Sequence, residues 1–168
     1  NFLFGFPYGL AMHDIASGEL QEPPVNRKTT KTVKTTVLDT TGTPTLLRVD
    51  NDQAVQRAAV EMSIPWRPSV PYRPDGKPVE RRVELIEEAG RTMLGASGLG
   101  VRFVPIAFHS WCTSHNLFQT QGHLVHQGGR TPFQICFGDK ALRVDGPHVF
   151  GQSATYVPPR NYLESDAK

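Results

Sequence analysis

The clearest periodic pattern of the chain lies between residues 79 and 94. Apolar side chains recur there every three or four positions and charged side chains fill the others, which predicts an amphipathic helix. Pro78 stands just before this segment, where proline favours a helix start, and the glycines that follow from Gly95 to Gly100 predict its end. Residues 101–118 are apolar and aromatic at roughly helical spacing, so we expect a second helix packed on the first.

A strand, a turn and a helix are predicted between residues 46 and 62. The short apolar run 46–49 is followed by Asp50, and apolar positions at helical spacing then continue through residues 52–62. Either Asn51 or Asp52 can supply the helix N-cap. Asp50 would therefore lie at the C-terminal edge of a strand, where ligand sites gather in open α/β sheets.

The first third of the chain is less regular. Residues 2–12 are apolar but interrupted by glycine and proline, which fits either a strand broken by a turn or a segment that docks on a partner. A turn is predicted at 14–18, and an edge strand at 20–25, because its two prolines cannot donate backbone hydrogen bonds. The basic, threonine-rich segment 26–38 leaves helix and strand open, and its lysines fit either a solvated face or a phosphate contact.

Prolines and glycines divide the rest of the chain. Five prolines within residues 63–78 predict an extended loop with no regular element. A polar loop is expected at 119–130, a short element from residue 131, and strand-like pieces at 148–150 and 154–157. We therefore expect a core-like domain at 1–118 and a loop-rich extension at 119–168.

Composition excludes several classes. The 15 glycines and 14 prolines, 29 of 168 residues, disfavour a helical bundle, a coiled coil and a collagen-like rod. No run approaches the roughly 18 apolar residues of a membrane span. The net charge is 18 − 16 = +2, which has the right sign for a nucleic-acid partner but an ordinary size.

The cysteines and histidines do not predict a metal site. Cys112 and Cys136 are too few for a disulfide scaffold, so we expect two buried thiols in a reducing compartment, with one disulfide as the alternative. Histidines lie near Cys112 in the chain, namely His109, His115, His123 and His126. Ligands spaced by three residues along one helix drift off a single face, so no zinc site is predicted.

Four motifs follow one another in the second part of the chain: RVDND at 48–52, PYRPDGKPVERR at 71–82, AGRTML at 89–94 and RTPFQICFGDKALRVDGPHVFGQSATYVPP at 130–159. In this order they resemble the catalytic core of copia-type retrotransposon integrases. HDIASGELQEPPVNRKT at 13–29 looks like the second strand of that family and its preceding turn. The resemblance implies an α/β, ribonuclease-H-like mixed sheet with flanking helices. It also implies a core that is truncated at its N-terminal strands or degenerate, with an irregular extension rich in proline and glycine.

The resemblance implies strand transfer on DNA by a Mg-dependent polynucleotidyl transferase, in which three carboxylates hold two divalent ions. Asp50 matches the acid that ends the fourth strand, and Glu80 matches the acid that opens the long helix. Both are therefore expected to be catalytic metal ligands. Their structural alternatives are a helix N-cap for Asp50 and a first-turn acid for Glu80. Four basic residues are expected to contact DNA: Arg73, Lys77, Arg81 and Arg82.

The third carboxylate is the weak point of the resemblance. Asp14 is the only well-placed candidate for this carboxylate in the chain, but its motif fits better with the turn acid that precedes the second strand of the family. The first-strand acid would then lie upstream of Asn1. The 29 residues between Asp50 and Glu80 are also fewer than the family pattern has.

Two readings of function remain open, and so does whether the chain is an enzyme. The first is an integrase-like domain that binds DNA, forms homo-oligomers and uses two Mg²⁺ ions if its site is intact. The second is a non-catalytic structural or accessory subunit of a larger protein assembly, derived from a retroelement. A weaker option is an inactive polyprotein fragment. An intracellular location, nuclear or cytoplasmic, is expected for the first reading.

Overall fold

The computed structural model describes residues 7–69, 78–118, 129–138 and 150–152. Short strands come first, as β1 (Tyr8–Gly9), β2 (Met12–His13), β3 (Leu20–Gln21) and β4 (Pro24–Val25). Helix α1 (Thr30–Thr41), strand β5 (Leu47–Val49), helix α2 (Gln53–Glu61) and strand β6 (Trp66–Pro68) follow. The last elements are α3 (Pro78–Ser97), a 3-10 turn (Val101–Phe103), α4 (Val104–Phe118) and α5 (Pro132–Phe137). None of the helices in these ranges is both long and apolar enough to cross a membrane.

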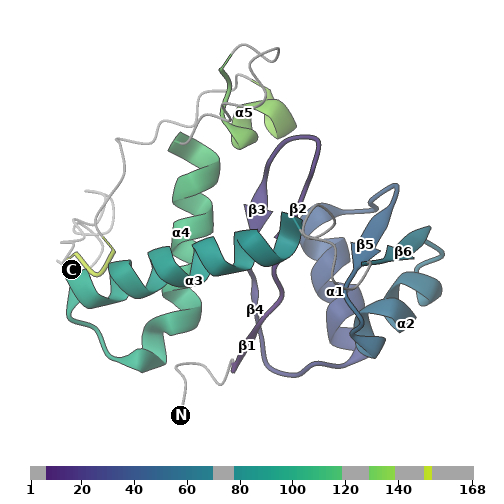
Figure 1. The fold of residues 1–168 in the computed structure, drawn as a ribbon, viewed down its shortest axis with the longest axis horizontal. Helices are drawn as coiled ribbons and strands as arrows, with labels where there is room; N and C mark the ends of the chain where they lie inside the picture. Colours follow the sequence, from purple (N-terminus) through teal and green to yellow (C-terminus); the bar gives the residue numbers. More distant parts are fainter. Residues whose placement is uncertain (1–6, 70–77, 119–128, 139–149, 153–168) are drawn as a thin grey trace, which may run out of the picture.

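A long antiparallel hairpin forms the centre of the molecule (Figure 1). β1 pairs with β4 and β2 pairs with β3, with Met12 opposite Gln21 and His13 opposite Leu20. Side chains of neighbouring strand residues point to opposite faces, so Met12 and Leu20 face opposite ways. Leu20 packs with Ile86 and Cys112 of α3 and α4, whereas Met12 packs with the α1 and α2 side chains. The hairpin is thus covered by a helix pair on each face.

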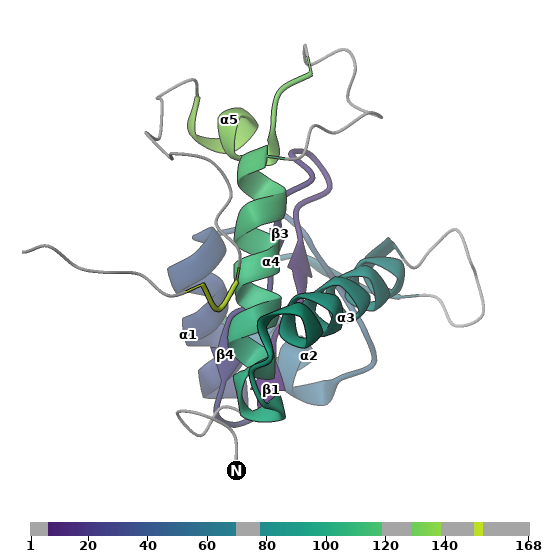
Figure 2. The same cartoon turned by 90° about the vertical axis from the view of Figure 1, so that its left-hand side faces the viewer.

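The two helix pairs differ in how their helices meet. α3 crosses α4 (Figure 2), and the crossing is close because Gly90 lies against the Phe108 ring, where a Cβ atom would collide. α1 and α2 instead share a small apolar cluster of Val33, Val37 and Ala58. The predicted helices at 79–94 and 101–118 and their mutual packing are confirmed.

Segment 26–38, whose type the sequence leaves open, forms most of helix α1. Thr29 caps the helix start by accepting a hydrogen bond from the Thr32 amide (3.2 Å). Later threonines donate their hydroxyls to carbonyls one turn back, as Thr41 does to Val37 (2.9 Å). These local bonds satisfy the hydroxyls inside the helix, and burial of Val33 and Val37 outweighs the β preference of threonine.

The prediction of no regular element in residues 63–78 is wrong at its start. β6 pairs in parallel with β5, with Leu47 opposite Trp66 and Val49 opposite Pro68. The Leu47 amide donates to the Pro65 carbonyl (2.9 Å), and the Ser69 amide donates to the Val49 carbonyl (2.8 Å). Pro65 therefore contributes only its carbonyl, and Pro68 points its nitrogen away from β5. Pro65 and Pro68 therefore lie at positions where the pairing of β6 with β5 requires no backbone amide, as is typical of prolines in edge strands.

The strands do not form one continuous sheet within the described residues. They form antiparallel pairs in the hairpin and the separate parallel pair β5–β6. The mixed α/β class is confirmed, but the predicted single mixed sheet is present only as these pairs. The outer edge of β3 is closed by Asn116 of α4, whose side-chain amide bonds both the amide (2.9 Å) and the carbonyl (2.7 Å) of Leu20.

The short element expected after residue 130 is helix α5. Thr131 and Gln134 bond each other's backbone amides in a capping box, and Pro132 follows the cap, which together start the helix. Cys136 lies on this helix and is exposed, so the expectation of two buried thiols is wrong for Cys136 and confirmed for Cys112. Both cysteines are free.

Candidate metal and DNA site

Asp50 directly follows the buried end of strand β5, as the sequence predicts. Val49 is buried, and Asp50 itself is exposed. Its Oδ1 accepts a hydrogen bond from the Asn51 amide (2.7 Å), and no other bond to its carboxylate is found among the described residues. The cap of helix α2 is Asp52, whose Oδ1 accepts from the Ala54 (2.8 Å) and Val55 (3.4 Å) amides. The structural alternative for Asp50, a helix N-cap, is therefore wrong.

Glu80 lies in the first turn of α3 and is exposed. An acid is stabilised there because the helix N-terminus carries a partial positive charge. Ile86 of α3 packs against the hairpin and α4, and Gly90 packs against Phe108 of α4. These contacts in the middle of α3 fix the direction of its first turn. Arg81, which is exposed, and Arg82, which is partly buried, follow Glu80 on the same turn. Arg73 and Lys77 lie outside the described residues.

Asp14 occupies the turn that connects β2 to β3. Its Oδ1 accepts from the Ala16 amide (3.1 Å), and its Oδ2 accepts from both the amide (3.2 Å) and the hydroxyl (2.5 Å) of Ser17. Both carboxylate oxygens thus stabilise the turn, which is the role that its motif indicates. Among the described residues, no three His, Cys, Asp or Glu side chains are placed to share one metal ion. The structure therefore does not bring Asp14, Asp50 and Glu80 to a single point.

The cysteine and histidines spaced by three residues on helix α4, for which no zinc site is predicted, differ in exposure. Cys112 and His115 are buried, whereas His109 is exposed. Burial, reinforced by the nearby Glu22 carboxylate, raises the pKa of Cys112 to about 12, so its thiol stays protonated. His123 and His126 lie outside the described residues.

Sequence reasoning missed the carboxyl group of Glu22, which lies in the hairpin between β3 and β4. Its side chain covers Gly9 of the opposite arm, where an added Cβ would collide with it. Its Oε2 is buried without a hydrogen-bond partner among the described residues. Burial, and to a lesser extent the Glu87 carboxylate of α3, raise the pKa of Glu22 to about 7. A glutamate that follows Gln21 and precedes two prolines carries no sequence signal of this burial.

Comparison with known proteins gives matches among solved structures alone. No protein-family model and no curated protein matches the chain. The HTLV-2 integrase catalytic core domain, solved in complex with magnesium in a trimeric form, matches with a TM-score of 0.54 and 17% identity over 76% of this chain and 93% of that chain. The fold is similar to that of an integrase catalytic core.

Two further integrase structures are similar. A chain of the simian T-cell lymphotropic virus intasome, solved in complex with the PP2A regulatory subunit B56 gamma, matches with a TM-score of 0.56 and 14% identity. That match covers 93% of this chain and 63% of the other. The BIV integrase catalytic core domain has 16% identity over 76% of this chain and 90% of its own, with a TM-score of 0.49. The likeness to the HTLV-2 and simian virus structures shows the integrase-like fold alone, because their identities are 17% and 14%, and the chemistry must come from the residues of this chain.

Proposed function

We propose that this chain is the integrase-like domain of a copia-type retroelement, which binds DNA and carries two carboxylates of a magnesium site for strand transfer. One observation carries the proposal. Asp50 lies directly after buried Val49, the last residue of the parallel strand β5, and remains outside the cap of α2, because Asp52 supplies that cap. In open α/β sheets this position beyond a strand end is where functional residues gather.

Asp50 and Glu80 would hold the metal. Both are exposed carboxylates, and a set of oxygen donors suits Mg²⁺ rather than softer ions. Magnesium, when bound, would activate the attacking oxygen and stabilise the leaving oxygen of the phosphoryl transfer. Arg81 and Arg82, together with Arg73 and Lys77, would bind and position the DNA phosphates beside it.

Strand transfer by this chemistry needs a third carboxylate, and among the described residues no third acid joins Asp50 and Glu80. The proposal for these two carboxylates is therefore metal binding, which can be examined apart from strand transfer.

Metal binding can be tested without catalysis. In a ¹⁵N-labelled chain, paramagnetic Mn²⁺ broadens the amide signals of residues close to it. We expect broadening at residues 50–52 and 79–82, and we expect its loss in Asp50→Asn and in Glu80→Gln. Asp52→Asn is the matched control, because asparagine keeps the N-cap while removing the same charge. Asp52→Asn is expected to keep the broadening.

The same preparation distinguishes the two functional readings. Salt-dependent binding to duplex DNA is expected for an integrase-like domain. Broadening that persists in both Asp50→Asn and Glu80→Gln would refute the metal site. A chain that binds neither Mn²⁺ nor DNA would instead favour a non-catalytic subunit of a larger assembly.

A further inference from the structure

The start of helix α1 carries a basic surface that the metal site does not use. We define it as Arg27, Lys28 and Lys31, all of which are exposed. Residues 26–38 contain four basic residues and no acidic one, a charge of +4, so the remaining residues of the +2 chain sum to 2 − 4 = −2. The net charge of this segment is therefore positive while that of the remaining residues is negative.

None of these three cations has an acidic partner among the described residues. Lys34, one turn further on, lies 4.0 Å from Glu61 of α2, at the limit of an ion pair. The first turn of α1 has no acid, although the partial positive charge of a helix N-terminus favours acids there and disfavours cations. The basic residues therefore destabilise the helix start slightly, and stability does not explain their position.

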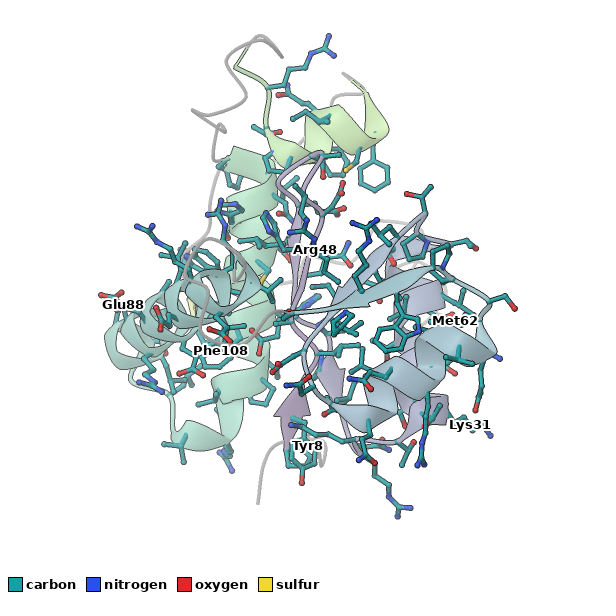
Figure 3. The ribbon with its side chains drawn as sticks, turned by 45° about the vertical axis from the view of Figure 1, so that its right-hand side comes forward. Tyr8, Lys31, Arg48, Met62, Glu88 and Phe108 are labelled. Carbon is teal, nitrogen blue, oxygen red and sulfur yellow. The ribbon has the colours of Figure 1, made fainter. Side chains whose placement is uncertain are left out.

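The hairpin adds an exposed aromatic ring to this surface. Tyr8 pairs across the hairpin with Val25, which leads directly into Arg27 and Lys28. The Lys28 ammonium lies 5.3 Å from the centre of the Tyr8 ring, which helps to hold the lysine in place. Tyr8 and Lys31 lie along the same edge of the molecule, and Arg48, which belongs to the strand that leads to Asp50, lies away from it (Figure 3). Burial of Val33 and Val37 keeps the basic side of α1 turned outward.

We propose that this basic surface binds the phosphate backbone of DNA at a place separate from Asp50 and Glu80. The inference rests on the proposed function, since it takes DNA as the partner. Lysine and arginine side chains on an exposed surface replace counterions along a regular polyanion, and such contacts are independent of base sequence. The surface would hold DNA to the domain beyond the reacting phosphate.

Salt dependence of binding tests the inference. Affinity for a fluorescent duplex of arbitrary sequence is measured by anisotropy over a range of salt concentrations, without divalent metal. Each phosphate contact contributes about 0.9 to the slope of log affinity against log salt. Lys28→Gln/Lys31→Gln should reduce the steepness by roughly 2. The matched control is Arg91→Gln/Arg102→Gln, which removes the same charge from exposed positions elsewhere and should leave the slope unchanged.

Each result has one meaning for the inference. An equal reduction of the slope in both double variants would show a general charge effect and overturn it. Strong binding to phosphatidylserine vesicles that depends on Lys28 and Lys31, without binding to DNA, would assign the surface to a membrane and also overturn it. Unchanged DNA binding in Lys28→Gln/Lys31→Gln, together with the Mn²⁺ response at Asp50 and Glu80, would overturn the inference and leave the metal site of the proposed function standing. If the wild-type chain binds no DNA, both the inference and the DNA binding of the proposed function are overturned.

Discussion

The buried carboxyl group of Glu22 makes the stability of this fold depend on pH. Its Oε2 lacks a partner among the described residues, and burial and Glu87 raise its pKa from 4.5 to about 7. Because the folded chain holds this proton more tightly than the unfolded chain, the neutral carboxyl favours folding. That contribution is fully present below about pH 4.5 and is lost as the pH rises through about 7.

The size of the effect follows from the shift. A difference of 7 − 4.5 = 2.5 pKa units corresponds to roughly 3 kcal/mol at about 1.4 kcal/mol per unit. Although Oε2 is buried, the Glu22 residue as a whole is only partly buried, and the neighbouring Glu87 carboxylate is ion-paired with Arg91 (2.8 Å). Solvent and this cation therefore reduce the cost of the Glu22 charge. We therefore expect about 2 kcal/mol between weakly acidic and weakly alkaline solution.

Glu22→Gln isolates this contribution. The variant keeps the shape of the side chain but cannot ionise, so it should match the wild type near pH 5 and exceed its unfolding free energy by about 2 kcal/mol near pH 8. Urea denaturation followed by circular dichroism at several pH values measures the difference. Glu88→Gln, at an exposed position of α3, is the control and should leave the pH dependence unchanged. A difference between Glu22→Gln and wild type that is constant with pH, or that grows toward acid, would refute the reasoning.

Two packing predictions concern α3 and α4. Asn116→Ala removes both hydrogen bonds to the Leu20 backbone and leaves its buried amide and carbonyl unpaired. Urea denaturation should therefore show a decrease of roughly 2–4 kcal/mol in the unfolding free energy. A decrease smaller than the error of the measurement would contradict this closure of the β3 edge. Gly90→Ala should destabilise by roughly 1–3 kcal/mol because its Cβ meets the Phe108 ring, whereas Gly95→Ala, in open space on the same helix, should stabilise by up to about 1 kcal/mol. Changes of the same sign at both glycines would contradict the close helix crossing.

The sequence by itself determined the elements whose patterns are local. The spacing of apolar residues predicted α3 and α4, and the run ending at Asp50 predicted a strand followed by a helix. The sequence also predicted a short element from residue 131 but not its type, which is helix α5 in the structure. These predictions succeeded because each depends on neighbours within a few positions, where periodicity and hydrogen-bonding groups can be read directly.

Only the tertiary structure decided the features that depend on distant residues. Burial of Val33 and Val37 against α2 decided that segment 26–38 forms a helix. The short strand β6 can form because its pairing with β5 uses no backbone amide of Pro65 or Pro68. The choice of Asp52 over Asn51 as the cap left Asp50 exposed beyond its strand. Glu22 is perturbed because the fold places it over Gly9 and beside Glu87. Charge and burial of this kind depend on chain segments brought together by folding, which no local pattern records.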